Sequence, residues 1–140
     1  MSAIGFRTGI LDTSTIILFE RLDEEDLPDE PLITAVTLAE LSVGPLVASD
    51  DVERAARQAR LQQAEADFDP LPFDAEAARA FGRVAASLRH AGRKVQARTY
   101  DAMIAATAIA NRLPLYTVNP TDFEGIPDLV LEGVAHPDHG

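Results

Sequence analysis

The sequence contains no cysteine, which excludes disulfide bonds and thiolate chemistry. It has no apolar run long enough to cross a bilayer, and residues 1–11 lack the basic segment and long apolar block of a secretory signal. We therefore expect a cytoplasmic protein that does not associate with membranes. At 140 residues, 46% of them hydrophobic, the chain can bury one core. We expect a single domain over residues 1–135 and a flexible tail over 136–140.

Positive charge is scarce, since 12 Lys and Arg residues stand against 23 Asp and Glu residues and give a formal net charge of −11. Over the whole chain this balance argues against a nucleic-acid partner. The excess acid lies in residues 1–80, with six basic and seventeen acidic side chains, whereas residues 81–140 carry six of each. A small basic stripe without acids remains, formed by Arg83, Arg89, Arg93, Lys94 and Arg98.

Short apolar runs alternate with helical patterns along the chain. Strands are predicted over 8–12, 32–34, 113–118 and near 128–134. Helices are predicted over 13–22, from about 37, over 50–67, over 74–92 with caps at Asp74 and Gly92, and over 99–113. The stretch 20–31 is predicted to be a solvated loop, and "FDPLPF" could hold a short edge strand. This alternation indicates an α/β fold with a parallel sheet covered on both faces.

Four acidic residues lie at the ends of predicted strands or near the starts of predicted helices, namely Asp12, Glu40, Asp101 and Asp122. Because the carboxyl ends of parallel strands share one edge of the sheet, these acids could meet there. Each also has a purely structural interpretation. Asp12 could cap a helix, and "TLAE" is a capping box in which Glu40 reaches back to Thr37. The helix dipole alone would favour Asp101 and Asp122.

Asp101 begins the apolar helix in "TYDAMIAATAIANRLPLYT". Helical spacing places it on the face of Ile104, Ala105 and Ala108, from which a surface acid would normally point away. Ionised carboxylates that gather in this way repel one another unless a cation neutralises them. Mg²⁺ or Mn²⁺ prefers oxygen ligands and can activate water. The acids therefore predict an oxygen-only metal site suited to phosphate chemistry.

The motifs "LDTST", "TLAEL", "YDAMIAATAIANRLPLYTVNPTDF" and "GIPDLVLE" resemble the PIN-domain family, specifically its VapC-type toxin ribonucleases, over about residues 8–133. The resemblance implies a three-layer α/β/α sandwich with a mostly parallel sheet. It also implies Mg²⁺- or Mn²⁺-dependent endoribonuclease activity, with Asp12, Glu40 and Asp101 as catalytic metal ligands. The fourth position stays open between Asp122 and Asn119, because Asn119 stands where family members often have an acid.

Polar and basic residues near these acids have two interpretations each. Thr13, Ser14 and Thr117 could orient the carboxylates, or could serve as caps and strand residues. The other set is Arg93, Lys94 and Arg98, which could meet RNA phosphates at the entrance of the acidic site. Alternatively, these three basic residues simply belong to a solvated helix end.

The resemblance further implies a type II toxin–antitoxin pair, with a cognate VapB-type antitoxin, an RNA substrate and a homodimer. The segments "TIILF" and "LSVGPLV" could supply a partner groove, although core burial also explains them. Two rival functions remain. A receiver-like phosphorelay domain is disfavoured because the single lysine, Lys94, lies in a helix-end loop. A catalytically inert PIN-fold binding module stays open because the fourth acid position is occupied by Asn119.

Overall fold

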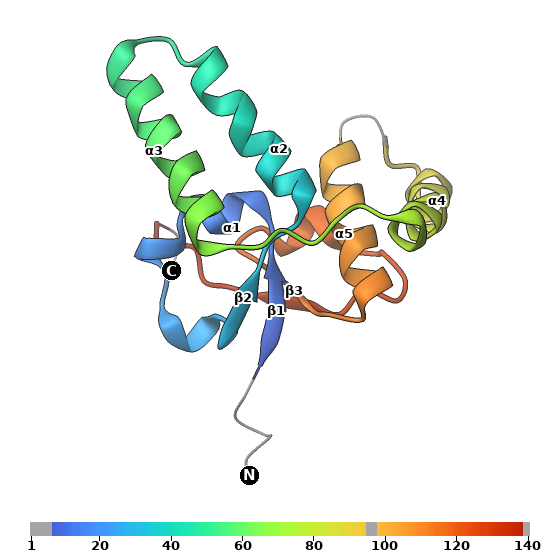
Figure 1. Ribbon diagram of the computed structural model, residues 1–140. Coiled ribbons are helices and arrows are strands. Elements are labelled where there is room, and N and C mark those ends of the chain that lie inside the picture. The colour runs from blue at the N-terminus through green and yellow to red at the C-terminus, as the bar shows by residue number, and fades with distance from the viewer. Residues whose placement is uncertain (1–6, 95–97, 139–140) are drawn as a thin grey trace.

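A sheet of four short parallel strands lies at the centre of the computed structural model, which describes residues 7–94 and 98–138 (Figure 1). The spatial order is β2-β1-β3-β4, and every pairing is parallel. The strands are β1 (Thr8–Leu11), β2 (Glu30–Leu32), β3 (Leu115–Thr117) and β4 (Leu131–Gly133). The predicted parallel α/β sheet is confirmed.

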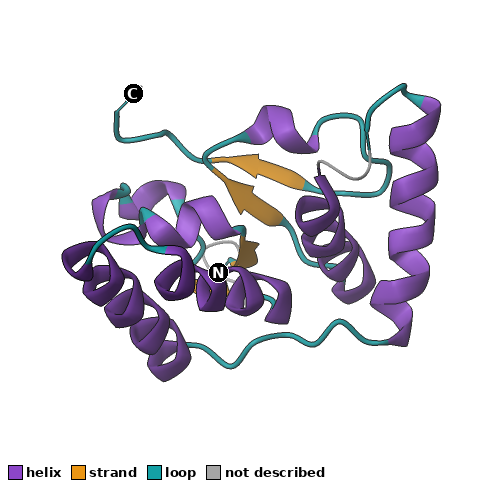
Figure 2. Cartoon of the chain, turned by 90° about the horizontal axis from the view of Figure 1, so that it is seen from above, coloured by secondary structure: helices purple, strands orange, loops and turns teal. Residues whose placement is uncertain are grey.

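Helices cover both faces of this sheet. The α-helices are α1 (Thr13–Ile17), α2 (Ala35–Val43), α3 (Asp51–Asp67), α4 (Ala75–His90) and α5 (Thr99–Asn111). Short 3₁₀ turns are η2 (Phe19–Arg21), η3 (Glu24–Asp26), η4 (Gly44–Val47) and η6 (Pro120–Phe123). Figures 1 and 2 show the α2–α3 hairpin on one side of the sheet and the α4–α5 pair on the other.

The two central strands contribute side chains to two separate hydrophobic cores, because successive side chains of a strand point to opposite faces. Ile10 of β1 and Leu115 of β3 pack with α4 and α5. Their neighbours Leu11 and Tyr116 pack on the other face with residues of α1, α2 and α3. Two cores separated by one sheet make the three-layer sandwich that the sequence predicts.

Both predicted caps of α4 are confirmed, whereas α5 ends two residues earlier than predicted. The Asp74 side chain accepts a hydrogen bond from the Ala77 N–H at 2.9 Å and caps α4. At the other end Gly92 has φ of +75°, the left-handed region that glycine favours. The Gly92 and Arg93 N–H groups bond the Arg89 and Leu88 carbonyls, the pattern of a Schellman cap. This cap directs Arg93 away from the α4 axis.

Several N-terminal boundaries differ from the sequence prediction. The first helix has only five residues and continues as η2. The second strand comes two residues earlier than predicted, and "FDPLPF" contributes one bridge, Thr34 to Leu71, rather than a strand. The stretch 20–31 is not wholly solvated, since Leu22, Leu27 and Pro28 are buried, and Leu22 and Leu27 belong to one core. Their apolar surface outweighs the acidic composition around them.

The predicted flexible tail lies partly outside the described residues, which end at Asp138. The Asp138 carboxylate accepts a 2.5 Å hydrogen bond from Arg21, and both side chains are exposed. Exposed ion pairs contribute little to stability. The tail therefore stays a prediction. Within residues 7–94 and 98–138 no helix combines the length and apolar character that a membrane span needs.

Candidate active site

The candidate site lies at the carboxyl ends of β1 and β3, the two central strands. After β1 the chain crosses to β2 on one side, whereas β3 and β4 lie on the other. In open parallel sheets such a change of direction leaves a crevice in which ligands bind. Asp12 follows β1 directly, and Asn119 and η6 follow β3.

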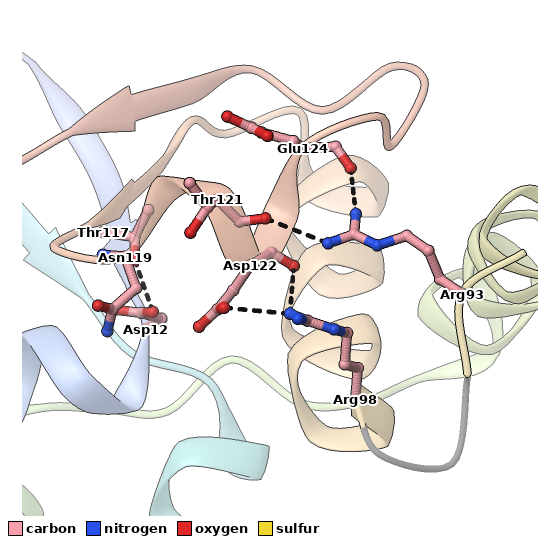
Figure 3. Close-up of polar contacts among 8 residues, drawn as sticks. All are labelled: Asp12, Arg93, Arg98, Thr117, Asn119, Thr121, Asp122 and Glu124. Carbon is pink, nitrogen blue, oxygen red and sulfur yellow. Dashed lines mark hydrogen bonds and ion pairs between the residues drawn. The ribbon is translucent and has the colours of Figure 1, made fainter. Parts of the chain in front are cut away.

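Asp12 is both a helix cap and a buried acid. Its side chain is 3% exposed and caps α1 by accepting the Thr15 N–H at 3.1 Å. It also accepts hydrogen bonds from the hydroxyls of Thr15 and Thr117, the latter at 2.8 Å (Figure 3). Burial raises the pKa of Asp12, the hydrogen bonds oppose this, and the charge of Asp122 adds to it. The structural and functional interpretations of Asp12 are therefore compatible.

Two threonine hydroxyls fix the orientation of the Asp12 carboxylate. The Thr15 hydroxyl accepts the Val118 N–H at 3.1 Å, and the Thr117 hydroxyl accepts the Asn119 N–H at 2.9 Å. Because each hydroxyl already accepts a hydrogen bond, its own proton is free to point at Asp12. Thr117 thus holds Asp12 as the sequence suggested, whereas Ser14 is exposed. Thr15 was missed, although its position three residues after an N-cap acid was the available signal.

Glu40 lies in the second turn of α2, not in the first turn as the sequence indicated. The N-cap of α2 is Thr34, whose hydroxyl accepts the Thr37 N–H at 3.2 Å, so the capping-box interpretation of "TLAE" is wrong. Instead the Thr13 hydroxyl donates to Glu40 at 2.6 Å. Burial raises the pKa of Glu40, this hydrogen bond lowers it, and the charge of Asp12 raises it further. Glu40 therefore faces Asp12.

Asp101 is the third residue of α5, whose N-cap residue Arg98 makes no side-chain cap. Burial, the largest cause, and the negative charges of three other carboxylates raise the pKa of Asp101 to about 6. Those carboxylates are Asp12, Asp122 and Glu40, and Arg98 acts in the opposite direction. The four acids that are scattered in sequence thus act on one another in the folded chain.

Asp122 and Asn119, the alternatives for the fourth position, both lie at η6. The Asp122 carboxylate accepts a 3.1 Å hydrogen bond from Arg98, and its charge acts on both Asp12 and Asp101. Asn119 follows β3 on the Asp12 side of the turn (Figure 3). Only Asp122 brings negative charge, so the electrostatics favour Asp122 and leave Asn119 as a neutral oxygen donor.

The three predicted RNA-binding residues have different environments. Arg93 donates to the Glu124 carbonyl at 2.5 Å and to the Thr121 carbonyl at 3.2 Å. Arg98 donates to the carbonyl and carboxylate of Asp122. Lys94 is exposed and makes no hydrogen bond or ion pair with the described part of the chain. RNA contact by these residues stays a prediction. Lys94 is the one of the three that has no hydrogen bond or ion pair within the described part of the chain.

The donor set suits a hard divalent cation in an open site. Among residues 7–94 and 98–138 no three acidic or histidine side chains converge closely enough to surround one ion. Mg²⁺ usually keeps several waters and takes only one or two carboxylates directly, so a looser group of four acids fits it. Burial is the largest cause of the raised pKa of Asp12, Glu40 and Asp101, and the negative charges of neighbouring acids add to it, so a bound cation would favour their ionised forms.

A three-layer parallel fold that brings four acids together from β1, α2, α5 and η6 defines the class of protein. The chain belongs to the PIN domain family, whose pattern matches residues 10–128. The resemblance stated from the sequence is thereby confirmed.

Within the PIN domain family, the chain is similar to several individual proteins. The chain is 45% identical over 112 residues to Ribonuclease VapC5 of Mycobacterium tuberculosis, covering 78% of this chain and 81% of the relative. It is 31% identical over 124 residues to Ribonuclease VapC of Rickettsia bellii, covering 86% and 91%. The crystal structure of the toxin–antitoxin system VapBC-5 from Mycobacterium tuberculosis matches with a TM-score of 0.79 and 40% identity, over 91% of this chain and 98% of that chain. DNA-bound VapBC from Salmonella typhimurium matches with a TM-score of 0.71 and 27% identity, over 91% and 98%.

Proposed function

We propose that this chain is a Mg²⁺-dependent endoribonuclease and the toxin of a VapBC-type toxin–antitoxin pair. The observation that carries the proposal is that Asp12, Glu40 and Asp122 come from separate segments and lie close enough to Asp101 for their charges to raise its pKa. Its support from relatives is that VapC5 and the Rickettsia bellii protein are named ribonucleases. Mn²⁺, which also prefers oxygen ligands, is an alternative cation.

The acids, with Asn119 as a neutral donor, would hold the ion, and their neighbours keep them in place. When bound, the cation supplies activated water and neutralises charge on the RNA phosphate. Thr15 and Thr117 fix the two oxygens of Asp12, so this carboxylate does not rotate. Thr13 fixes Glu40, and the first turn of α5 carries Asp101 on a helix anchored by the buried Ala105 and its neighbours. The acids are thus oriented before ligand arrives.

Metal removal tests the proposal directly. We expect purified protein to cleave RNA in Mg²⁺ or Mn²⁺, to stop in excess EDTA, and to recover when the metal is restored, because the uncompensated acids otherwise repel the phosphate. Gel analysis of a labelled RNA measures this, and sequencing of RNA ends after induced expression identifies the target. Cleavage that persists in EDTA contradicts the proposal. Calorimetry without any Mg²⁺ or Mn²⁺ binding favours the inert binding module instead.

We further propose that the VapB-type antitoxin docks in a groove between α1 and α3, which has both apolar and charged lining residues. The groove has a volume of about 490 Å³ and is lined by residues 16–21, by α3 residues that include Ala56 and Ala64, and by Phe68, the C-cap of α3. Ile17 in this lining is 42% exposed, so part of its apolar side chain is open to a partner. The predicted partner segment "TIILF" therefore leaves apolar surface uncovered. The support for the occupant is that structural relatives are VapBC complexes.

A charge in the groove should weaken antitoxin binding. We expect Ile17→Asp to lower affinity for the co-expressed antitoxin at least about tenfold, since an unpaired carboxylate must be desolvated on docking. Val130→Asp is the matched control, because Val130 is 58% exposed and does not line the groove. Calorimetric titration measures both. Equal affinities for the two variants would place the antitoxin elsewhere. Light scattering of the same samples tests the predicted homodimer.

A further inference from the structure

The turn that carries Asp122 is held by two arginines from a different part of the chain. Arg93 follows α4, and Arg98 precedes α5. Together they donate to three main-chain carbonyls of the turn, those of Thr121, Asp122 and Glu124 (Figure 3). No other segment described in the structure donates a side-chain hydrogen bond to these carbonyls.

The turn has little else to fix it. It is a single 3₁₀ turn, and its N-cap residue Asn119 makes no side-chain cap. Only Phe123 is buried, and it anchors the turn in the core on the α4–α5 side. An isolated 3₁₀ turn has poor hydrogen-bond geometry of its own. The position of Asp122 relative to the other acids therefore depends on the Phe123 anchor and on the arginine contacts.

The two arginines act on Asp122 differently. Arg98 touches the Asp122 carboxylate at 3.1 Å, so it contributes charge as well as position. Arg93 touches only the carbonyls of Thr121 and Glu124, which lie one residue before and two residues after Asp122. Two separate nitrogens of its guanidinium bridge them, which a single ammonium cannot reproduce. The effect of Arg93 on the acids is therefore geometric.

We propose that Arg93 is a positioning residue of the metal site. By bridging Thr121 and Glu124 it keeps Asp122 beside Asp12 and Asp101, and its loss lowers metal affinity without removing a ligand. This inference rests on the proposed function. It replaces the phosphate-contact role that the sequence suggested for Arg93 and leaves that role to Lys94.

Metal affinity measured without RNA tests the inference. Calorimetric titration of Mn²⁺ should show about tenfold weaker binding by Arg93→Met, the range found when residues that orient metal ligands are replaced. Arg93→Lys should be weakened similarly because it keeps the charge but loses the bridge. Lys94→Met removes a neighbouring charge and should bind metal as the unaltered protein does. In an Asp122→Asn background, Arg93→Met should cause no further loss, since both changes act through one carboxylate.

RNA binding measured in EDTA distinguishes a positioning role of Arg93 from a phosphate contact. A positioning role predicts that Arg93→Met weakens RNA binding less than Lys94→Met, which removes the same charge, whereas an equal or larger loss would return the phosphate-contact role to Arg93. Unchanged Mn²⁺ affinity in Arg93→Met and Arg93→Lys would overturn the inference while leaving the proposed function intact. Absence of Mn²⁺ binding by the unaltered protein would overturn both. Arg93→Lys, which retains charge and aliphatic stem, keeps the test available if Arg93→Met does not fold.

Discussion

Asp101→Asn should produce a protein that is inactive and yet more stable than the original. Without metal at pH 7.5, we expect its free energy of unfolding to rise by about 1–2 kcal/mol. RNA cleavage should fall at least about 100-fold, because the variant lacks one of the charges that hold the cation. Gain of stability with loss of function is the expected mark of a residue kept for chemistry.

The sign follows from the raised pKa of Asp101, which is about 6 in the folded chain against 3.8 as its ordinary value. A carboxyl whose pKa is higher in the folded state destabilises that state once it is ionised. Stability of the metal-free protein therefore rises as pH falls from about 6 towards about 4, and the full penalty is present above pH 6. Two pKa units correspond to about 3 kcal/mol, and partial exposure of Asp101 reduces this to the value given above.

Urea denaturation in EDTA at pH 7.5 and pH 5.0 measures the effect. The stability difference between Asp101→Asn and the original protein should shrink at pH 5.0, where Asp101 is largely protonated. Mg²⁺ should stabilise the original protein more than the variant. Glu65→Gln is the control, since Glu65 is an exposed acid of α3 and should change stability by no more than about 0.5 kcal/mol. A variant less stable than the original at pH 7.5 would contradict the electrostatic account.

Two substitutions at Asp12 should separate its roles as cap and ligand. Asp12→Asn keeps an oxygen for the Thr15 N–H and remains a good N-cap, so we expect a stability change within about 1 kcal/mol. Asp12→Ala leaves donors of Thr15 and Thr117 without their buried acceptor and should lose about 2–4 kcal/mol. Both should lose RNA cleavage at least about 100-fold, because both lack the carboxylate charge.

The comparison needs stability and activity on the same preparations. Thermal or urea unfolding gives the first, and cleavage of a labelled RNA in Mg²⁺ gives the second. Asp12→Asn that folds and still cleaves within threefold of the original would remove Asp12 from the metal site. Equal stabilities of the two variants would instead show that the hydrogen bonds seen at Asp12 contribute little.

The fold was predictable from sequence where local signals and burial agree. The helix Asp51–Asp67 has strong helix formers and no glycine or proline, and Asp74 and Gly92 are caps with a specific geometry. The error at α2 arose because two threonines compete as its cap. Thr34, not Thr37, caps α2 in the structure. Thr34 also forms a β-bridge with Leu71, a contact across 37 residues that no local pattern contains.

The proximity of the acids was predictable from sequence, whereas their hydrogen-bond partners were not, and the role of the acids as metal ligands stays a prediction. Strand ends of a parallel sheet must share an edge, so the meeting of Asp12 and Asp122 follows from topology. The arginine contacts to η6 depend instead on how the end of α4 lies against that turn. The sequence showed a basic stripe, but it did not show that Arg93 and Arg98 use their donors inside the protein.

The hydrogen bonds of Asp12 have a consequence for judging related chains. A lineage that stopped cutting RNA would still need Asp12 to cap its first helix and accept the Thr15 and Thr117 protons, so folding alone would retain this acid. Asp101 accepts no side-chain or backbone hydrogen bond among the described residues, and burial of its charge opposes folding. In a related chain that has lost nuclease activity, Asp101 should therefore be substituted before Asp12. The presence of Asp101, which destabilises the fold, is therefore a better indicator of nuclease activity in a related chain than the presence of Asp12, which stabilises it.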